Sequence, residues 1–199
     1  MIHFRVRDYL SVLLYRGLFA PWFAGFGRRV RVVWPLRIVG CRYIRLHDGV
    51  TLQYGAYVAA TNGSGGVPAL EIGGDTLIGN YSHIICTRRI EIGARVLIAD
   101  RVYISDNLHE YRDISRAVMD QPVRQLGEVV IGSGSWIGEN ACIIGCRIGR
   151  NCVIGANSVV THDVPDYCVA AGAPAVPLKR FCADSGSWRK TDSRGNFQD

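Results

Sequence analysis

One aliphatic residue followed by a small or second aliphatic residue recurs every six positions over much of this 199-residue chain. Period six fits neither the 3.6-residue repeat of a helix nor the alternation of hairpin strands. It is typical of a β-helix, in which each unit forms one short strand and one turn, and the aliphatic side chain points inward. The repeats are Ile72-Gly73, Ile78-Gly79, Ile84-Ile85, Ile92-Gly93, Ile98-Ala99, Ile104-Ser105, Ile131-Gly132, Ile137-Gly138, Ile143-Ile144, Ile148-Gly149, Ile154-Gly155 and Val160-Thr161, after a weaker series at Ile38, Ile44, Val50 and Ala56. The pattern predicts an all-β fold, a parallel β-helix over residues 36–182.

The interruptions of this register are also informative. Two extra residues lie around Arg88-Arg89, and the step from Ile143 to Ile148 is one residue short. Between Ile104 and Ile131 the repeats give way to a polar loop, residues 106–127. A loop of this length that interrupts a solenoid is usually functional or disordered, so we expect it to project from the coils.

Positive charge is concentrated at the N-terminus. Residues 1–47 contain nine Arg and one acid, whereas the remainder carries 14 basic and 16 acidic residues. A nucleic-acid-binding protein should be basic along its folded body, so no nucleic-acid partner is expected. Residues 1–35 form a separate basic and aromatic segment, in which 6–26 reads as an amphipathic helix broken at Pro21.

Two interpretations of this segment are compatible. The helix can cover the open first coil, or it can bind an anionic membrane surface through its aromatics and arginines. The arginines in question are Arg5, Arg7, Arg16, Arg28, Arg29 and Arg31. No secretory signal or membrane-spanning stretch is recognisable, which indicates a cytoplasmic protein, peripheral to the membrane if the second interpretation applies.

The cysteines and the C-terminus offer little chemistry. The seven Cys lack CxxC pairs and are expected to be buried, reduced and small. No zinc-ligand spacing is present, and no metal is expected. Residues 183–199 are rich in Ser, Gly and charge, which predicts a disordered tail.

The repeats and the C-terminal elements together resemble the hexapeptide-repeat acyltransferases. The resemblance runs from about Leu36 to Phe181 and is most specific from Gly127 to Pro174, with the elements IGANSVVTHDVP and VAAGAPA. The branch is that of sugar O-acetyltransferases similar to maltose and galactoside acetyltransferases and to those of surface-polysaccharide pathways. The resemblance implies a left-handed β-helix, a homotrimer with active sites between subunits, and acetyl-CoA as the donor.

Acetyl transfer to a hydroxyl needs a base near neutral pH, a task that suits His. His109 stands at the start of the long loop and matches the catalytic His of the family. Its ring needs an orienting partner, for which Glu110, Asp106 or a backbone carbonyl can serve. The resemblance puts the oxyanion-binding backbone N–H groups in the turn 135–139.

Substrate residues are suggested by the same resemblance. Asn80 or His83 is expected to contact the acceptor, or else to have a structural role at the surface. Trp136 is expected either to stack on a sugar ring or to pack at the subunit interface. The positions that match the CoA site are Glu139, Ala156, Thr161, His162, Lys179 and Arg180. Because His162 replaces the usual Lys, the cations expected at the phosphates are Lys179 and Arg180.

The predicted function is acetyl-CoA-dependent O-acetylation of a sugar in a surface polysaccharide, such as exopolysaccharide or lipopolysaccharide, or in its lipid-linked precursor. An N-acetyltransferase acting on an amino sugar, an antibiotic or another small amine would use the same base. A non-catalytic β-helix scaffold is the alternative from another class. A metalloenzyme of the carbonic-anhydrase type would need three converging histidines, and the five in this chain are spread along it.

Overall fold

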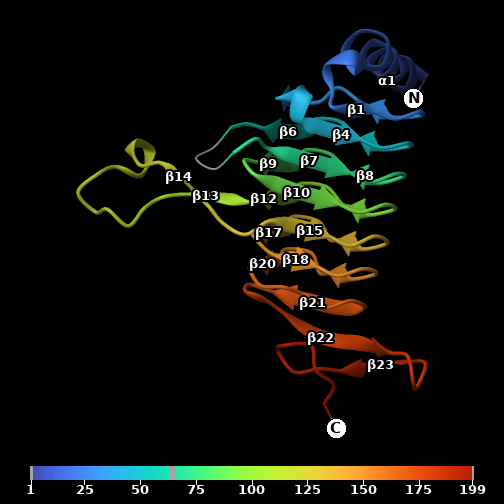
Figure 1. The fold of residues 1–199 in the computed structure, drawn as a ribbon. Coiled ribbons are helices and arrows are strands. Elements are labelled where there is room, and N and C mark those ends of the chain that lie inside the picture. The colour runs from blue at the N-terminus through green and yellow to red at the C-terminus, as the bar shows by residue number, and fades with distance from the viewer. Residues whose placement is uncertain (1, 63–65, 199) are drawn as a thin grey trace.

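The computed structural model describes residues 2–62 and 66–198, with side chains from Val6 onward. Its body is a left-handed parallel β-helix in which six coils stack along one axis (Figure 1). Each coil contributes one strand to each of three parallel sheets, which form the sides of a prism. The predicted fold class is therefore confirmed.

The three sheets have the following strands. Sheet A contains β1 (Gly25–Phe26), β4 (Ile44–Leu46), β7 (Ala69–Ile72), β10 (Arg89–Ile92), β15 (Val129–Ile131) and β18 (Arg147–Ile148). Sheet B contains β2 (Arg31–Val32), β5 (Thr51–Leu52), β8 (Leu77–Ile78), β11 (Leu97–Ile98), β16 (Trp136–Ile137) and β19 (Val153–Ile154), and continues through β21 (Cys168–Gly172), β22 (Ala175–Cys182) and β23 (Ser187–Lys190). Sheet C contains β3 (Arg37–Val39), β6 (Tyr57–Ala60), β9 (His83–Cys86), β12 (Tyr103–Ser105), β17 (Cys142–Ile144) and β20 (Val159–Val160).

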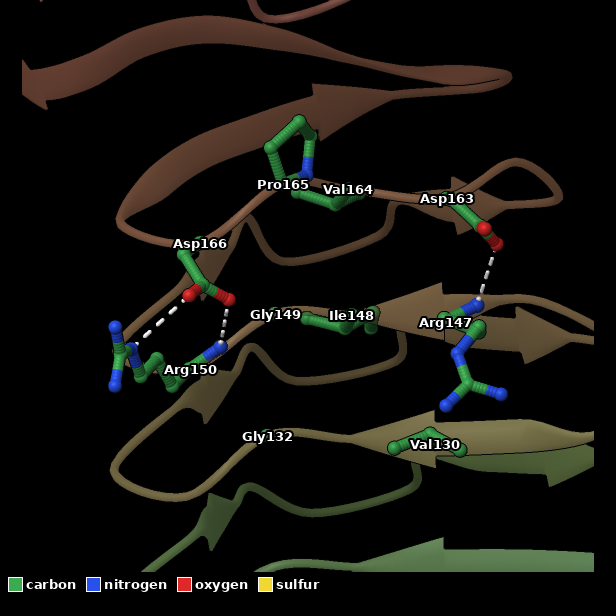
Figure 2. Close-up of a pocket in the computed structure, with 10 residues that line it drawn as sticks. All are labelled: Val130, Gly132, Arg147, Ile148, Gly149, Arg150, Asp163, Val164, Pro165 and Asp166. Atoms are coloured by element: carbon green, nitrogen blue, oxygen red, sulfur yellow. Dashed lines mark hydrogen bonds and ion pairs between the residues drawn. The ribbon is translucent and has the colours of Figure 1, made fainter.

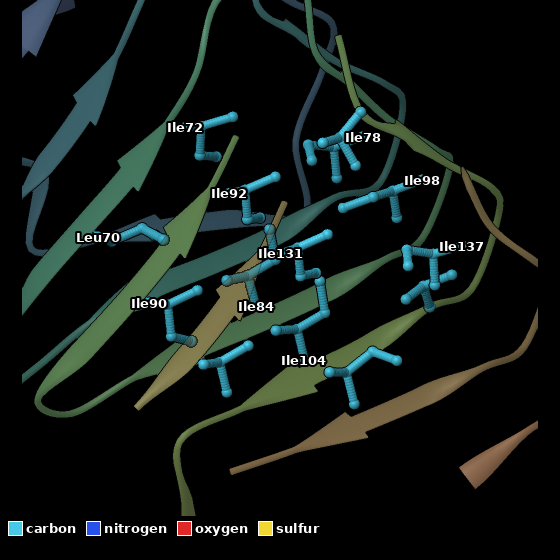
Figure 3. Close-up of a cluster of buried hydrophobic side chains, with 14 of the residues drawn as sticks. Leu70, Ile72, Ile78, Ile84, Ile90, Ile92, Ile98, Ile104, Ile131 and Ile137 are labelled. Carbon is cyan, nitrogen blue, oxygen red and sulfur yellow. The ribbon is translucent and has the colours of Figure 1, made fainter. Parts of the chain in front are cut away.

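The core is a column of aliphatic side chains inside the coils (Figure 3). Parallel pairing aligns equivalent residues of successive coils, so that Ile84 pairs with Ile104 and Ile104 with Ile143. Each of these isoleucines is fully buried. Six residues make one side of the prism. Every sixth residue therefore has the same position in its strand, and its side chain points into the interior.

The β-helix begins at Gly25 rather than at residue 36. Val30 and Val32 are fully buried in the first coil, and β2 pairs with β5. The sequence signal is weak here because these valines stand among Arg28, Arg29, Arg31 and Trp34.

The N-terminal segment covers the open end of this first coil. Helix α1 (Ile2–Leu14) continues through a π-helical turn (Tyr15–Phe19) and a 3₁₀ turn (Ala20–Trp22) that contains Pro21. The Ser11 hydroxyl, fully buried, donates to the carbonyl of Val32 at 2.9 Å and accepts from the amide of Trp34 at 2.9 Å. The capping interpretation thus has direct contacts in the structure.

The C-terminal segment differs from the disorder that its composition suggested. Strand β23 pairs antiparallel with β22, and Phe181 lies opposite Trp188 with ring centroids 5.7 Å apart. The chain therefore ends in an antiparallel extension of sheet B rather than in a free tail. Aromatic pairing and backbone hydrogen bonds offset the low hydrophobicity of the segment.

The cysteines are all unpaired, and five of the seven are buried. Burial raises the pKa of Cys86 to about 12 and those of Cys146 and Cys152 to about 11. These three cysteines act as small protonated apolar groups, as predicted, whereas Cys41 and Cys142 are only partly buried.

Candidate active site

The long loop leaves the β-helix directly after β12 and projects to one side of the stack (Figure 1). Its two ends form an antiparallel hairpin of β13 (Asn107–His109) and β14 (Val123–Gln125), and a 3₁₀ turn (Val118–Asp120) lies farther out. The projection predicted for this loop is observed.

Asp106 fixes the base of the hairpin. Its fully buried carboxylate accepts hydrogen bonds from the backbone amides of Thr87, Arg88 and Arg89 at 2.7–3.1 Å. Asn107 donates a further hydrogen bond at 2.9 Å. Burial alone would raise the pKa of Asp106, but hydrogen bonds from Asn107, Thr87 and Arg88 outweigh it and lower this pKa. The two extra residues in the repeat thus supply amides that bind the loop carboxylate.

Gln125 closes the same junction from the returning strand. Its amide nitrogen donates to the carbonyl of Asp106 at 2.7 Å, and its carbonyl oxygen accepts from the Thr87 hydroxyl at 2.8 Å. Sequence reasoning missed this residue because only the folded hairpin brings it beside Asp106. The hairpin that carries His109 is consequently held by a fixed polar cluster.

His109 is the last residue of β13 and is exposed. Its register partner is Val123, and within the described residues no protein group hydrogen-bonds its imidazole. Both ring nitrogens are therefore available to a substrate or to a group from another chain. This is the state that a general base needs before its acceptor binds.

Neither carboxylate that we expected to orient His109 contacts it. The Asp106 carboxylate instead accepts hydrogen bonds from the backbone amides at the base of the loop. Glu110 accepts from Arg112 at 2.9 and 2.5 Å, and the Arg112 guanidinium lowers the pKa of Glu110 to about 2. The difference arises because backbone amides and an adjacent arginine compete for these carboxylates.

The two expected acceptor residues lie near one another in sequence but have different environments. The Asn80 side chain donates to both oxygens of Asp100 at 3.0 and 3.1 Å, which leaves its amide nitrogen occupied. His83 lies half-buried on β9, edge-on to Tyr57 with ring centroids 5.5 Å apart, and pairs in register with Tyr103 of β12. His83 thus shares sheet C with the strand from which the loop starts.

Trp136 lies on sheet B, stacked in register between Leu97 and Val153. Half of its surface is exposed, so either a sugar or another subunit can cover it. The amides of Trp136 and Gly138 donate to the next coil at 2.8 and 2.9 Å. They are therefore not free to bind an oxyanion, which leaves fewer donors in the turn 135–139 than the resemblance implied.

Glu139 and Ala156 occupy equivalent positions in successive coils at the corner between sheets B and C, as the hydrogen bond from Asn157 to the carbonyl of Glu139 shows. The Glu139 carboxylate pairs with Arg101, which sequence reasoning did not single out. Arg101 also donates to Asn140 at 3.0 Å. Any contact of Glu139 with CoA would therefore be through its backbone.

The other predicted CoA residues lie toward the C-terminal end of the stack. Thr161 and His162 follow β20, and the Thr161 hydroxyl is 3.0 Å from Nδ1 of His162. Lys179 lies on β22 with Nζ 5.5 Å from the Trp188 ring centroid. Arg180 donates to the carbonyl of Asp166 at 3.1 Å. The C-terminal hairpin supplies the aromatic face under Lys179.

Within the part of the chain that the structure describes, the predicted residues thus lie on separate elements: the loop hairpin, sheet B, sheet C and the corner between these sheets. A separate hollow of about 530 Å³ on sheet A contains none of them (Figure 2). Its carboxylates are used within the fold, because Asp163 accepts from the Arg147 amide at 2.8 Å and Asp166 from Arg150 at 2.9 and 3.0 Å. These aspartates stabilise the last coil, and their hydrogen bonds do not indicate a substrate site in this hollow.

Comparisons with known proteins settle the family. The hexapeptide repeat of succinyl-transferase matches residues 128–162. WbbJ of Escherichia coli strain K12, named "Putative lipopolysaccharide biosynthesis O-acetyl transferase", is 33% identical over 186 residues, covering 83% of this chain and 93% of the relative. The chain belongs to the hexapeptide-repeat acetyltransferase family.

Other relatives of this hexapeptide-repeat acetyltransferase differ in length or in sequence. A probable acetyltransferase of Mycobacterium tuberculosis is 37% identical over 137 residues, which is 68% of this chain but only 39% of that protein. The solved structure of AntD, an N-acyltransferase from Bacillus cereus in complex with dTDP and 3-hydroxybutyryl-CoA, has a TM-score of 0.71 at 18% identity, covering 85% of this chain and 89% of the other. At that identity the likeness shows the fold alone.

Proposed function

We propose that this hexapeptide-repeat acetyltransferase moves an acetyl group from acetyl-CoA to a hydroxyl of a sugar in a surface polysaccharide or its lipid-linked precursor. The observation that carries the proposal is the exposed imidazole of His109, which has no hydrogen-bond partner among the described residues and lies on a hairpin that Asp106 and Gln125 hold to the coils. The relative WbbJ, named for O-acetyl transfer in lipopolysaccharide biosynthesis, supports the choice of acceptor class. An acetyl-CoA donor fits a reaction in the cytoplasm.

The reaction follows from general base catalysis. A ring nitrogen of His109 takes the proton of the sugar hydroxyl while the hydroxyl oxygen attacks the carbonyl carbon of the thioester. The tetrahedral oxyanion collapses, the carbon–sulfur bond breaks, and the imidazolium returns its proton to the leaving thiolate. The products are the acetyl ester and CoA, and no covalent enzyme intermediate is needed.

A homotrimer would complete the site. The loop that carries His109 leaves the coils from sheet C. Trp136 and Lys179 lie on sheet B. Glu139 and Ala156 lie at the corner between these two sheets. A neighbouring copy that brings its sheet B against this loop would give the His109 ring a partner and form a cleft for the donor. Lys179, packed over Trp188, is a suitable cation for a CoA phosphate.

A second candidate is N-acyl transfer to an amino sugar or another small amine. AntD, which shares the fold, is an N-acyltransferase, so this fold can carry either reaction. The base and cleft would be the same, so the nature of the acceptor distinguishes the two reactions.

The test compares His109→Ala with His47→Ala, using thiol release from acetyl-CoA. His47 is a matched control because it is an exposed histidine that directly follows β4, and its ring nitrogen Nε2 lies 2.5 Å from a carboxylate oxygen of Glu71. We expect His109→Ala to lower kcat by about 10²–10⁴-fold and His47→Ala to retain wild-type turnover. Wild-type turnover in His109→Ala would remove His109 from the mechanism.

A further inference from the structure

The outer side of helix α1 is apolar and has no partner within the described chain. Residues three and four apart share one side of a helix, and on this side lie Val6, Tyr9, Leu10 and Leu13, which are 55%, 63%, 56% and 47% exposed. The opposite side carries Ser11 and Val12, which are buried against the first coil. We call these four exposed residues the apolar stripe.

More large apolar side chains extend the stripe. Leu14, Leu18 and Trp22 follow it along the chain and are also exposed, Trp22 at 70%. A soluble surface helix normally presents a polar outer face, and clusters of exposed apolar residues of this kind mark a contact surface. The stripe therefore needs an occupant.

A basic pocket adjoins the stripe and identifies that occupant. Tyr9 of the stripe also lines a hollow of about 660 Å³ together with Asp8, Arg16, Arg29 and Arg31. Three arginines face one aspartate there, so the pocket attracts anions. One of these arginines is paired, since Nη2 of Arg29 lies 3.6 Å from Oδ1 of Asp75. The other two, Arg16 and Arg31, are exposed.

We infer that this end of the β-helix docks on a membrane that contains anionic phospholipid, with the stripe in the headgroup region and a lipid phosphate in the arginine pocket. Apolar side chains beside like-charged arginines match such a surface. A two-fold contact between copies through the same stripe would instead bring arginines together. No helix within residues 2–62 and 66–198 is long and apolar enough to cross a bilayer, and the interfacial mode does not require one. The side chain of Arg5, expected to join this surface, lies outside the described residues.

The position of the stripe has a consequence for the acceptor, which rests on the proposed function. Helix α1 lies at the end of the stack opposite the C-terminus (Figure 1), and the loop with His109 leaves the fourth coil. Coils are spaced by about 4.8 Å, so the loop starts about 14 Å below the first coil. A saccharide whose lipid anchor stays in the bilayer would have to span this distance, which favours an acceptor of more than one sugar unit.

The experiment is co-sedimentation of the full chain with vesicles of phosphatidylcholine alone or mixed with phosphatidylglycerol, which needs no acetyl transfer. We expect binding to the mixed vesicles, at least ~10-fold weaker partitioning of Leu10→Glu/Leu13→Glu, and about fivefold weaker partitioning for each of Arg16→Gln and Arg31→Gln at low salt. Leu178→Glu is the matched control, because Leu178 is 50% exposed and lies on β22 at the far end. Circular dichroism checks that each variant is folded.

The inference fails if the wild-type protein does not bind the mixed vesicles, or if the stripe variant binds them as well as the wild type does. It also fails if Leu10→Glu/Leu13→Glu lowers the solution mass, because the stripe is then an interface between copies. If the wild-type protein binds the mixed vesicles but releases no thiol from acetyl-CoA, the proposed function is refuted and the membrane inference is not.

Discussion

Asp106→Asn tests whether the loop carboxylate organises the site. The carboxylate accepts from three backbone amides and from Asn107. Asparagine keeps one carbonyl oxygen, so at least one buried amide loses its acceptor or faces the new NH₂ group. A hydrogen bond to a charged group contributes about 1.5–3 kcal/mol, and with one or two lost we expect a decrease of about 2–4 kcal/mol in the free energy of unfolding.

The pH dependence gives a sharper test of the same cluster. The pKa of Asp106 is lowered in the folded protein, so its ionised form stabilises the fold above the unfolded pKa of about 3.9. That contribution is lost as the pH falls from there through the lower folded pKa. The difference in stability between wild type and Asp106→Asn should therefore be constant above about pH 5 and shrink below about pH 4.

Urea denaturation monitored by circular dichroism measures both quantities. Asp184→Asn is the control, because Asp184 is exposed at the C-terminal end. The reasoning is refuted if Asp106→Asn changes the free energy of unfolding by less than about 0.5 kcal/mol, the usual range of neutral surface changes. It is equally refuted if the difference grows as the pH falls.

Three further outcomes are expected. Ile98→Ala should destabilise the protein by about 2–5 kcal/mol in urea denaturation, because Ile98 is fully buried between Ile78 and Ile137; a loss below 1 kcal/mol would contradict the packing described. Trp188→Ala should raise the KM for acetyl-CoA by about two- to fivefold at unchanged kcat, since Lys179 loses its aromatic support, and an unchanged KM would remove Lys179 from the donor site. Glu110→Gln should leave the acidic limb of the kcat/KM profile in place between pH 5 and 8, because the pairing with Arg112 keeps the Glu110 pKa near 2; a displaced limb would show that Glu110 contacts His109 in the working enzyme.

The sequence predicted the coils well because their period is local. Ile84, Ile104 and Ile143 could be assigned to the interior from spacing alone, and all three are buried. The coil that starts at Gly25 and the hairpin around Trp188 were missed, because each depends on pairing with an element whose register the repeat does not reveal.

The candidate site was less predictable. His109 could be proposed from its place in the interrupting loop, but the partners of Asp106, Glu110 and Asn80 could not. Those partners are backbone amides, Arg112 and Asp100, and only the folded chain shows which donor lies nearest each group. If the site forms between copies, as proposed, it includes contacts that no single-chain pattern contains.

The most direct test of the proposed function is to identify the bond that forms. Wild-type protein is incubated with acetyl-CoA and a panel of sugars, lipid-linked saccharides and amino compounds, and each product is analysed by mass spectrometry before and after mild alkali. We predict an acetylated saccharide whose acetyl group is removed by alkali, as an ester requires, formed together with stoichiometric free CoA. An alkali-stable acetyl group on an amine would establish N-acetyl transfer instead, and the absence of CoA release with every acceptor would contradict the assignment of catalytic activity.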